Sequence, residues 1–227
     1  MRPYIVVVKE KMLQADKTYK GHVILSYTIK YPQFISDRFH LILNKLNIFY
    51  RTKALMYEKS NISNLFQMAM VEYEYSVAHN YPIRAFEAFT AYKTTYNRNC
   101  AISLYFDQYE YTGGAHGITV RSSDTWHLIK SKKLELQEFF PYQQDYRSYI
   151  IDHIIKEIEG QIAEGNNIYF ENYKQLVQEN FKENSFYLTN DGLVIYYQQY
   201  DIAPYSSGIV EFTIPYSSRG ATPPNCY

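Results

Sequence analysis

A histidine and a carboxylate stand on either side of a glycine-rich turn near the middle of the chain. Glycine takes positive φ at little steric cost, so the backbone can turn sharply here or lie flat against a ligand. Glu110 and His116 occupy opposite arms, which lets imidazole and carboxylate approach each other as an acid–base pair. The turn itself consists of Thr112, Gly113, Gly114, Ala115, His116 and Gly117.

Three interpretations of His116 stay open: a structural histidine in a tight turn, which we favour, a ligand contact, and a metal ligand. Asp124 and His127 are near in sequence, but their spacing matches no metal pattern. The chain has no G-x-S-x-G nucleophile elbow, no phosphate loop and no dinucleotide fingerprint. We therefore predict no catalytic residues, no metal and no cofactor. The alternative is a hydrolase that uses His116 with Glu110 or Asp124.

A second unusual segment is the loop from Tyr200 to Gly208, which lies between two predicted strands. Proline stiffens it, and tyrosine is a rigid amphipathic anchor that loses little entropy on binding. This composition is typical of a protein-binding loop in which Tyr205 would be the anchor. The competing interpretation is an ordinary loop whose tyrosine folds back on the core.

Composition limits the function. The 227 residues include 26 Tyr, and 46% are hydrophobic, which is typical of a folded protein. The 23 basic and 23 acidic side chains cancel, which argues against a nucleic-acid binder. No stretch approaches the roughly 20 apolar residues of a membrane span, and the N-terminus does not resemble a secretion signal. Cys100 and Cys226 would pair in an oxidising compartment, but two free thiols are the favoured expectation.

The first part, residues 1–100, reads as two strands, two helices and a returning strand. Strands are expected at Arg2–Leu13 and His22–Tyr31, the second closed by Pro32. A helix face then steps by fours and threes, capped by Ser36 or Asp37. Residues 59–64 break this rhythm before a second helix. The further strands expected in the chain are Arg84–Arg98, Ala101–Tyr111 and Gly117–Lys130, an antiparallel meander.

The second part, residues 101–227, carries the glycine turn. An amphipathic helix is expected over Asp145–Glu164, and a shorter one over Tyr173–Asn180. Asn190, Asp191 and Gly192 indicate a hairpin, and residues 220–227 read as a frayed tail. The predicted class is α+β, with antiparallel sheets and packed helices in two α/β parts.

Four features in this order resemble a bacterial domain pair of unknown function: the Tyr109–Gly117 turn, a helix after Phe139 and Phe140, the Asn-Asp-Gly hairpin, and the Tyr200–Gly208 loop. The pair is similar to the extracytoplasmic lysozyme-binding region of the anti-sigma factor RsiV. It also precedes the catalytic domain of some peptidoglycan deacetylases. The likeness covers most of the chain and is strongest over residues 103–216.

The resemblance implies a non-catalytic binding or sensor module of the cell envelope. Its partners would be lysozyme or peptidoglycan fragments, bound by Pro204, Tyr205 and Ser206, with Thr112, Gly113, Gly114 and His116 as a second contact. Sigma inhibition and deacetylation do not carry over, because neither a sigma-binding segment nor a deacetylase domain is recognised in the sequence. We expect the chain either to be cut from a longer one or to have lost its export. The oligomeric state stays open.

Overall fold

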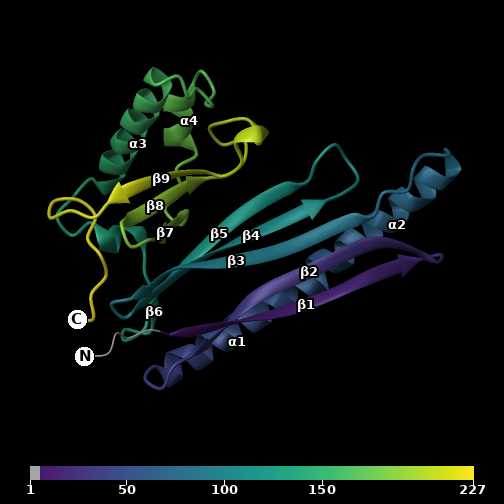
Figure 1. Cartoon of the computed structure of the whole chain (residues 1–227), viewed down its shortest axis with the longest axis horizontal. Coiled ribbons are helices and arrows are strands. Elements are labelled where there is room, and N and C mark those ends of the chain that lie inside the picture. The colour runs from purple at the N-terminus through teal and green to yellow at the C-terminus, as the bar shows by residue number, and fades with distance from the viewer. Residues whose placement is uncertain (1–5) are drawn as a thin grey trace. The chain divides into compact units, whose positions relative to one another are not determined.

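The computed structural model describes residues 6–227, and these residues form two sheets and four α-helices (Figure 1). One sheet has the strand order β1-β2-β3-β4-β5-β6, and the other has the order β7-β8-β9. The α+β class is confirmed. Contacts divide the described chain into two units: residues 6–92 with 106–120, and residues 93–105 with 121–227. The boundary predicted between residues 100 and 101 falls at the β3–β4 turn.

The first unit begins with a long antiparallel hairpin of β1 (Val7–Tyr19) and β2 (His22–Ile35). The first four residues of the strand expected at Arg2–Leu13 lie outside the described residues, and β1 runs six residues beyond its expected end. β2 also continues through Pro32, which we expected to close it. Pairing between β2 and β3 ends at Ile29, so the missing N–H of Pro32 interrupts no ladder on that side.

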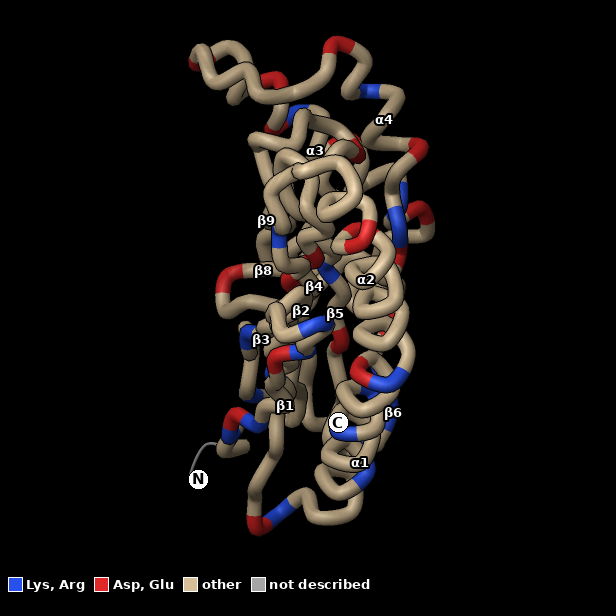
Figure 2. Tube along the Cα trace, turned by 90° about the vertical axis from the view of Figure 1, so that its right-hand side faces the viewer, with Lys and Arg blue, Asp and Glu red and all other residues tan. Residues whose placement is uncertain are grey.

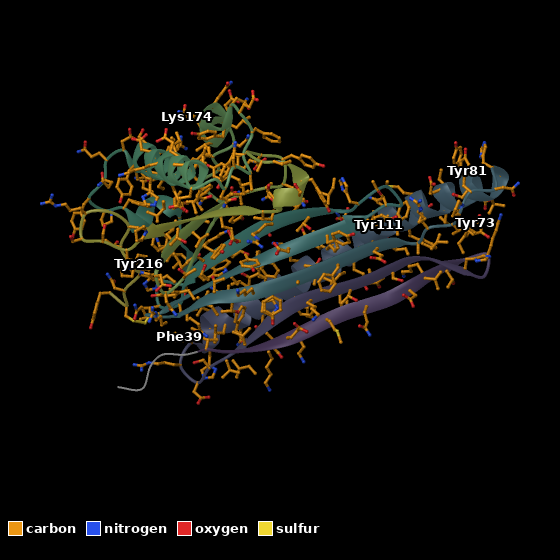
Figure 3. All side chains as sticks on the ribbon, turned by 45° about the horizontal axis from the view of Figure 1, so that its top comes forward. Phe39, Tyr73, Tyr81, Tyr111, Lys174 and Tyr216 are labelled. Carbon is orange, nitrogen blue, oxygen red and sulfur yellow. A yellow bond between two sulfur atoms is a disulfide. The ribbon has the colours of Figure 1, made fainter. Side chains whose placement is uncertain are left out.

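A single helical rod follows, instead of the two separated helices that the sequence indicated. α1 (His40–Tyr57) passes without a break through η1 (Glu58–Ile62), one turn of π-helix, into α2 (Ser63–Ala78). The predicted caps were wrong. Phe39, labelled in Figure 3, is the N-cap, and its side chain forms no capping hydrogen bond. Phe39 is instead buried, so apolar packing fixes this helix end.

The π-turn keeps one face of the rod on the sheet. Buried or half-buried residues recur every four positions from Leu46 to Ile62. In a regular α-helix each such step drifts by about 40°, because a turn takes 3.6 residues. The wider turn of η1 offsets this drift, so the α2 residues Leu65, Ala69 and Tyr73 still face the core of the first unit.

The rod returns the chain to the sheet beside β2, and this sets the pairing of the next strand. β3 (Phe86–Arg98) is parallel to β2, an exception to the antiparallel pattern that we expected. A helical crossover leads to a parallel neighbour, whereas tight turns lead to antiparallel ones. β4 (Ala101–Tyr111) has its predicted bounds, and β5 (Ile118–His127) ends three residues before its predicted end.

The second unit packs the three-stranded sheet against helices around its own core. In α3 (Tyr146–Ala163), Ile150, Ile154 and Ile158 are fully buried, and Asp145 caps the helix by accepting a hydrogen bond from the backbone N–H of Ser148. The Asn-Asp-Gly hairpin joins β7 to β8, as predicted. The other elements are β6 (Lys132–Lys133), η2 (Leu136–Phe139), α4 (Tyr173–Glu179), β7 (Phe186–Leu188), β8 (Gly192–Tyr197), η3 (Tyr205–Ser207) and β9 (Val210–Pro215).

The C-terminal segment is fixed in place, contrary to the expectation of a frayed tail with two free thiols. Cys100 and Cys226 form a disulfide, with 5.2 Å between their Cα atoms. The backbone N–H of Thr222 donates to the Phe139 carbonyl, and the side chain of Ala221 is fully buried. The segment lacks periodicity because its backbone forms only isolated contacts, such as the bridge between Tyr216 and Ala221, and no regular helix or strand.

Charges of both signs are interspersed along the chain (Figure 2). Lys132 pairs with Glu138 and Lys133 with Asp124, so these two neighbouring lysines are neutralised locally. Among the described residues, no helix combines the length and the apolar composition needed to cross a bilayer.

The disulfide generates a stability prediction. It closes a loop with a sequence separation of 126 residues, so in the chain-entropy account Cys226→Ser should lower the free energy of unfolding by roughly 2–5 kcal/mol. Urea unfolding with and without reductant measures this loss. Reduction should destabilise the wild type by the same amount and leave the variant unchanged. Equal free energies of unfolding for the oxidised wild type and the variant would contradict the presence of a stabilising disulfide.

Candidate binding site

The glycine turn is held by three specific contacts within the first unit. Gly113 has φ +84°, in the left-handed region. The Arg84 guanidinium donates to the Gly113 carbonyl at 2.9 Å, and the phenol of Tyr111, labelled in Figure 3, donates to the Gly114 carbonyl at 3.1 Å. A Cβ on Gly117 would lie 2.4 Å from the Tyr109 ring. The turn is therefore a packed and fixed element.

A groove of about 610 Å³ lies beside this turn, and it contains several of the predicted site residues. Thr112 and His116 line it from the turn, and Glu110 lines it from β4. The facing wall comes from the helical rod at and before its π-turn, through Lys53, Met56, Tyr57, Ser60 and Asn61. Gln108, Ile118 and Val120 complete the lining.

The carboxylate of the groove is held by a phenol. Tyr57 donates its hydroxyl to Oε1 of Glu110 at 2.6 Å. Burial and this hydrogen bond raise the pKa of Tyr57 far above its ordinary value. The phenol therefore stays protonated at neutral pH and keeps one carboxylate oxygen of Glu110 occupied.

The π-turn that follows Tyr57 is also hydrogen-bonded to the sheet. The Tyr27 hydroxyl on β2 donates to Oε1 of Glu58 at 2.6 Å, and burial, followed by this hydrogen bond, raises the pKa of Tyr27 to about 12. Ser60 donates to the Met56 carbonyl at 2.7 Å inside the widened turn. These hydrogen bonds fix the wall of the groove, and single π-turns are frequently found at functional sites.

His116 is exposed at the mouth of the groove, with Nδ1 3.2 Å from the Gly117 carbonyl. It shares the groove with Glu110 but not with Asp124, which is buried in the second unit and paired with Lys133. His127 is also structural, because Nε2 lies 2.9 Å from the Asn225 carbonyl. Its burial lowers its pKa. Of the groups considered for acid–base chemistry, the groove holds His116 and Glu110.

The loop after β8, in the second unit, is anchored at its base and open at its tip. Asn180 donates to the Asp201 carbonyl at 2.8 Å, and the side chain of Ile202 is fully buried. Pro204 and Ser206 are exposed, and Tyr205 is half-buried. The Tyr205 ring lies 5.9 Å from that of Tyr200. The loop thus presents an aromatic pair on a fixed base.

The predicted contacts therefore belong to two separate candidate surfaces. Thr112 and His116 lie at the groove, and Pro204, Tyr205 and Ser206 lie on the loop. Sequence reasoning missed Lys53, Ser60 and Asn61, which helix packing brings to the groove. The break in helical rhythm near residue 59 was their signal, and we interpreted it as a break between two helices.

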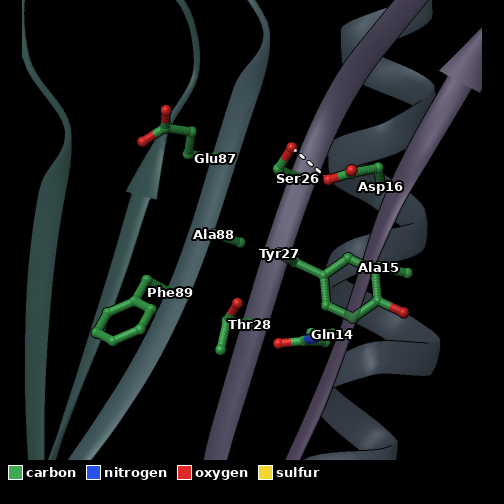
Figure 4. A pocket seen from close by; sticks show the side chains of 9 residues that line it. All are labelled: Gln14, Ala15, Asp16, Ser26, Tyr27, Thr28, Glu87, Ala88 and Phe89. Atoms are coloured by element: carbon green, nitrogen blue, oxygen red, sulfur yellow. Dashed lines mark hydrogen bonds between the residues drawn. The ribbon is translucent and has the colours of Figure 1, made fainter.

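Another hollow of about 450 Å³ lies over β1, β2 and β3 in the first unit (Figure 4). Its polar groups satisfy one another in part, because Ser26 donates to Asp16 at 2.7 Å. Tyr27 and Phe89 contribute aromatic surface. No residue that the sequence singled out lies there.

The turn yields a prediction with an internal control. Gly117→Ala should destabilise the protein by roughly 1–3 kcal/mol, because the added methyl overlaps the Tyr109 ring and the Glu110 carbonyl. Gly114→Ala in the same turn meets no atom within 4 Å, so we expect a change within about 0.5 kcal/mol. Urea unfolding of both variants measures the difference. Equal effects would contradict the packing described.

Two segments of this chain match models of known protein families. Residues 20–119 match the family model described as Deacetylase PdaC, and residues 137–217 match that of a protein of unknown function, DUF3298. The chain is 24% identical over 181 residues to the peptidoglycan-N-acetylmuramic acid deacetylase PdaC of Bacillus subtilis strain 168. That alignment covers 78% of this chain and 34% of the deacetylase, so the chain spans about a third of its length.

Two solved structures share the fold. A DUF3298 family member from Bacteroides fragilis superposes with a TM-score of 0.69 at 20% identity, covering 95% of this chain and 92% of that one. A DUF3298 family protein from Pseudomonas aeruginosa PAO1 gives 0.59 at 18% identity, with 99% and 97% covered. The chain thus pairs a segment of the PdaC type with a DUF3298 segment, as the resemblance to a domain pair of unknown function led us to expect.

Proposed function

We propose that this chain is a non-catalytic binding or sensor module of the bacterial cell envelope that recognises lysozyme or a peptidoglycan-related ligand. The observation that carries the proposal is the anchored loop with exposed Pro204 and Ser206 around half-buried Tyr205. Its base is buried and hydrogen-bonded, so little conformational entropy is lost when the tip meets a partner.

The ligand class follows from the relatives. The Bacillus relative is by name a peptidoglycan deacetylase, and it is matched over a third of its length. Lysozyme is included as a candidate ligand because the domain pair resembles the exterior region of RsiV. Both ligands belong to the same surroundings, because lysozyme acts on peptidoglycan.

The disulfide supports the proposed compartment. Structural disulfides persist in oxidising surroundings such as the periplasm or the cell surface, and are rare in the cytosol. Cys100 and Cys226 form such a bond, which joins the β3–β4 turn to the C-terminal segment of the same unit. An extracytoplasmic location accounts for it.

The groove supports a second contact. It combines apolar lining from Met56, Ile118 and Val120 with hydrogen-bonding side chains such as Gln108 and Asn61. Saccharide and peptide ligands present both apolar faces and amide or hydroxyl groups, which suits such a mixed surface. Thr112 and His116 at its mouth would contact the ligand.

Titration with lysozyme and with soluble muropeptides tests the proposal. Tyr205→Ala should weaken binding by about 2 kcal/mol, roughly thirtyfold in Kd, because an interface tyrosine on a fixed loop is a typical hot spot. Tyr142→Ala is the matched control, since Tyr142 is 73% exposed outside the loop. Calorimetry measures both. If neither ligand binds the wild type, the proposal is wrong. If Tyr205→Ala and Tyr142→Ala lose the same affinity, the loop is not the binding surface.

The groove also favours one second candidate, a hydrolase that uses His116 with Glu110, because both line the same concavity. In that case His116→Ala and Glu110→Gln would each abolish release of acetate or reducing ends from purified peptidoglycan. In the binding module neither product is released by the wild type, and the two variants alter affinity alone.

A further inference from the structure

The outer side of the helical rod is unusually apolar for a surface helix. A helix packed on a sheet normally turns charged and polar residues outward. Here large apolar side chains recur on the exposed side on both sides of the π-turn, each 42–83% exposed. We refer to them as the outer helix face: Leu41, Ile48, Leu55, Met68, Val71 and Tyr75.

Their spacing forms a stripe. Leu41, Ile48 and Leu55 follow one another at intervals of seven, the repeat that keeps residues on one side of a helix when two helices pack together. Beyond the π-turn, Met68, Val71 and Tyr75 continue at intervals of three and four. The rod spans residues 40–78, about 58 Å at 1.5 Å per residue, which offers a continuous docking edge.

Charge on the rod is divided between its two ends. α1 carries Lys45, Arg51 and Lys53 and no acidic residue, whereas α2 carries Glu72 and Glu74 and no lysine or arginine. A second copy laid antiparallel on the first would place each basic half against an acidic half. A parallel pair would oppose like charges instead.

We propose that the outer helix face binds a second copy of this chain, as an antiparallel pair of rods related by a twofold axis near Lys59. In this arrangement Lys45 of each copy lies beside Glu72 of the other, while Glu74 is paired with Lys20 of its own chain. Ile48 of one copy meets the α2 stripe of the other near Val71. The interface is isologous, so every contact occurs twice, as is usual for homodimers.

Analytical ultracentrifugation of the whole chain over a range of concentrations tests the pairing. The wild type should sediment as a dimer. Ile48→Glu should raise the dimer Kd by roughly 100-fold, because the twofold axis places its unpaired charge in the apolar stripe twice, once in each half of the interface. Ile129→Glu is the control, since Ile129 is 54% exposed in the other unit. A monomeric wild type, or equal effects of the two variants, would overturn the proposal.

Charge exchange tests the orientation. Lys45→Glu and Glu72→Lys should each weaken the dimer by about tenfold, and the double variant should restore it, because the exchanged charges meet again across an antiparallel interface. In a parallel pair each residue meets its own copy, so the double variant would behave like the wild type and the single ones would not weaken it. That outcome, or binding of a monomeric wild type to phosphatidylglycerol vesicles through the same face, would refute the antiparallel dimer.

Discussion

The first unit depends on one geometric constraint: a single rod must keep one apolar face on a sheet over its whole length. A regular α-helix cannot do so when its buried residues recur every fourth position, because the face rotates about the axis. The π-turn at Glu58–Ile62 offsets the rotation. Tyr27 and Tyr57 fix that turn to β2 and β4 through hydrogen bonds to Glu58 and Glu110. Core, groove wall and outer helix face all follow from this arrangement.

Tyrosine does much of this positioning. A buried phenol supplies apolar area and one donor, and the carboxylate that accepts from it needs no buried cation. Burial raises the pKa of such phenols, as for Tyr27 and Tyr57, and it also raises that of Tyr197 in the second unit, whose hydroxyl donates to the Val177 carbonyl. The abundance of tyrosine, 26 of 227 residues, thus serves internal hydrogen bonding as well as strand formation.

The second unit obtains its rigidity differently. Three isoleucines of α3 are fully buried, and the disulfide attaches the C-terminal segment to the β3–β4 turn. On this base the loop around Tyr205 is held by Asp201 and Ile202 while its tip remains accessible. The two candidate surfaces therefore lie on separate units, each fixed by its own core.

Local sequence alone determined the class, most strands, the α3 helix and the Asn-Asp-Gly hairpin, because alternation, periodicity and turn chemistry act over a few residues. It also indicated the glycine turn as a rigid element. Tertiary structure decided the rest. The interruption near Lys59 became a π-turn because the core required the same face beyond it, and β3 became parallel because the rod returned the chain. The pairing of Cys100 with Cys226 and the meeting of Glu110 with Tyr57 depend on contacts between residues far apart in sequence, which no local pattern encodes.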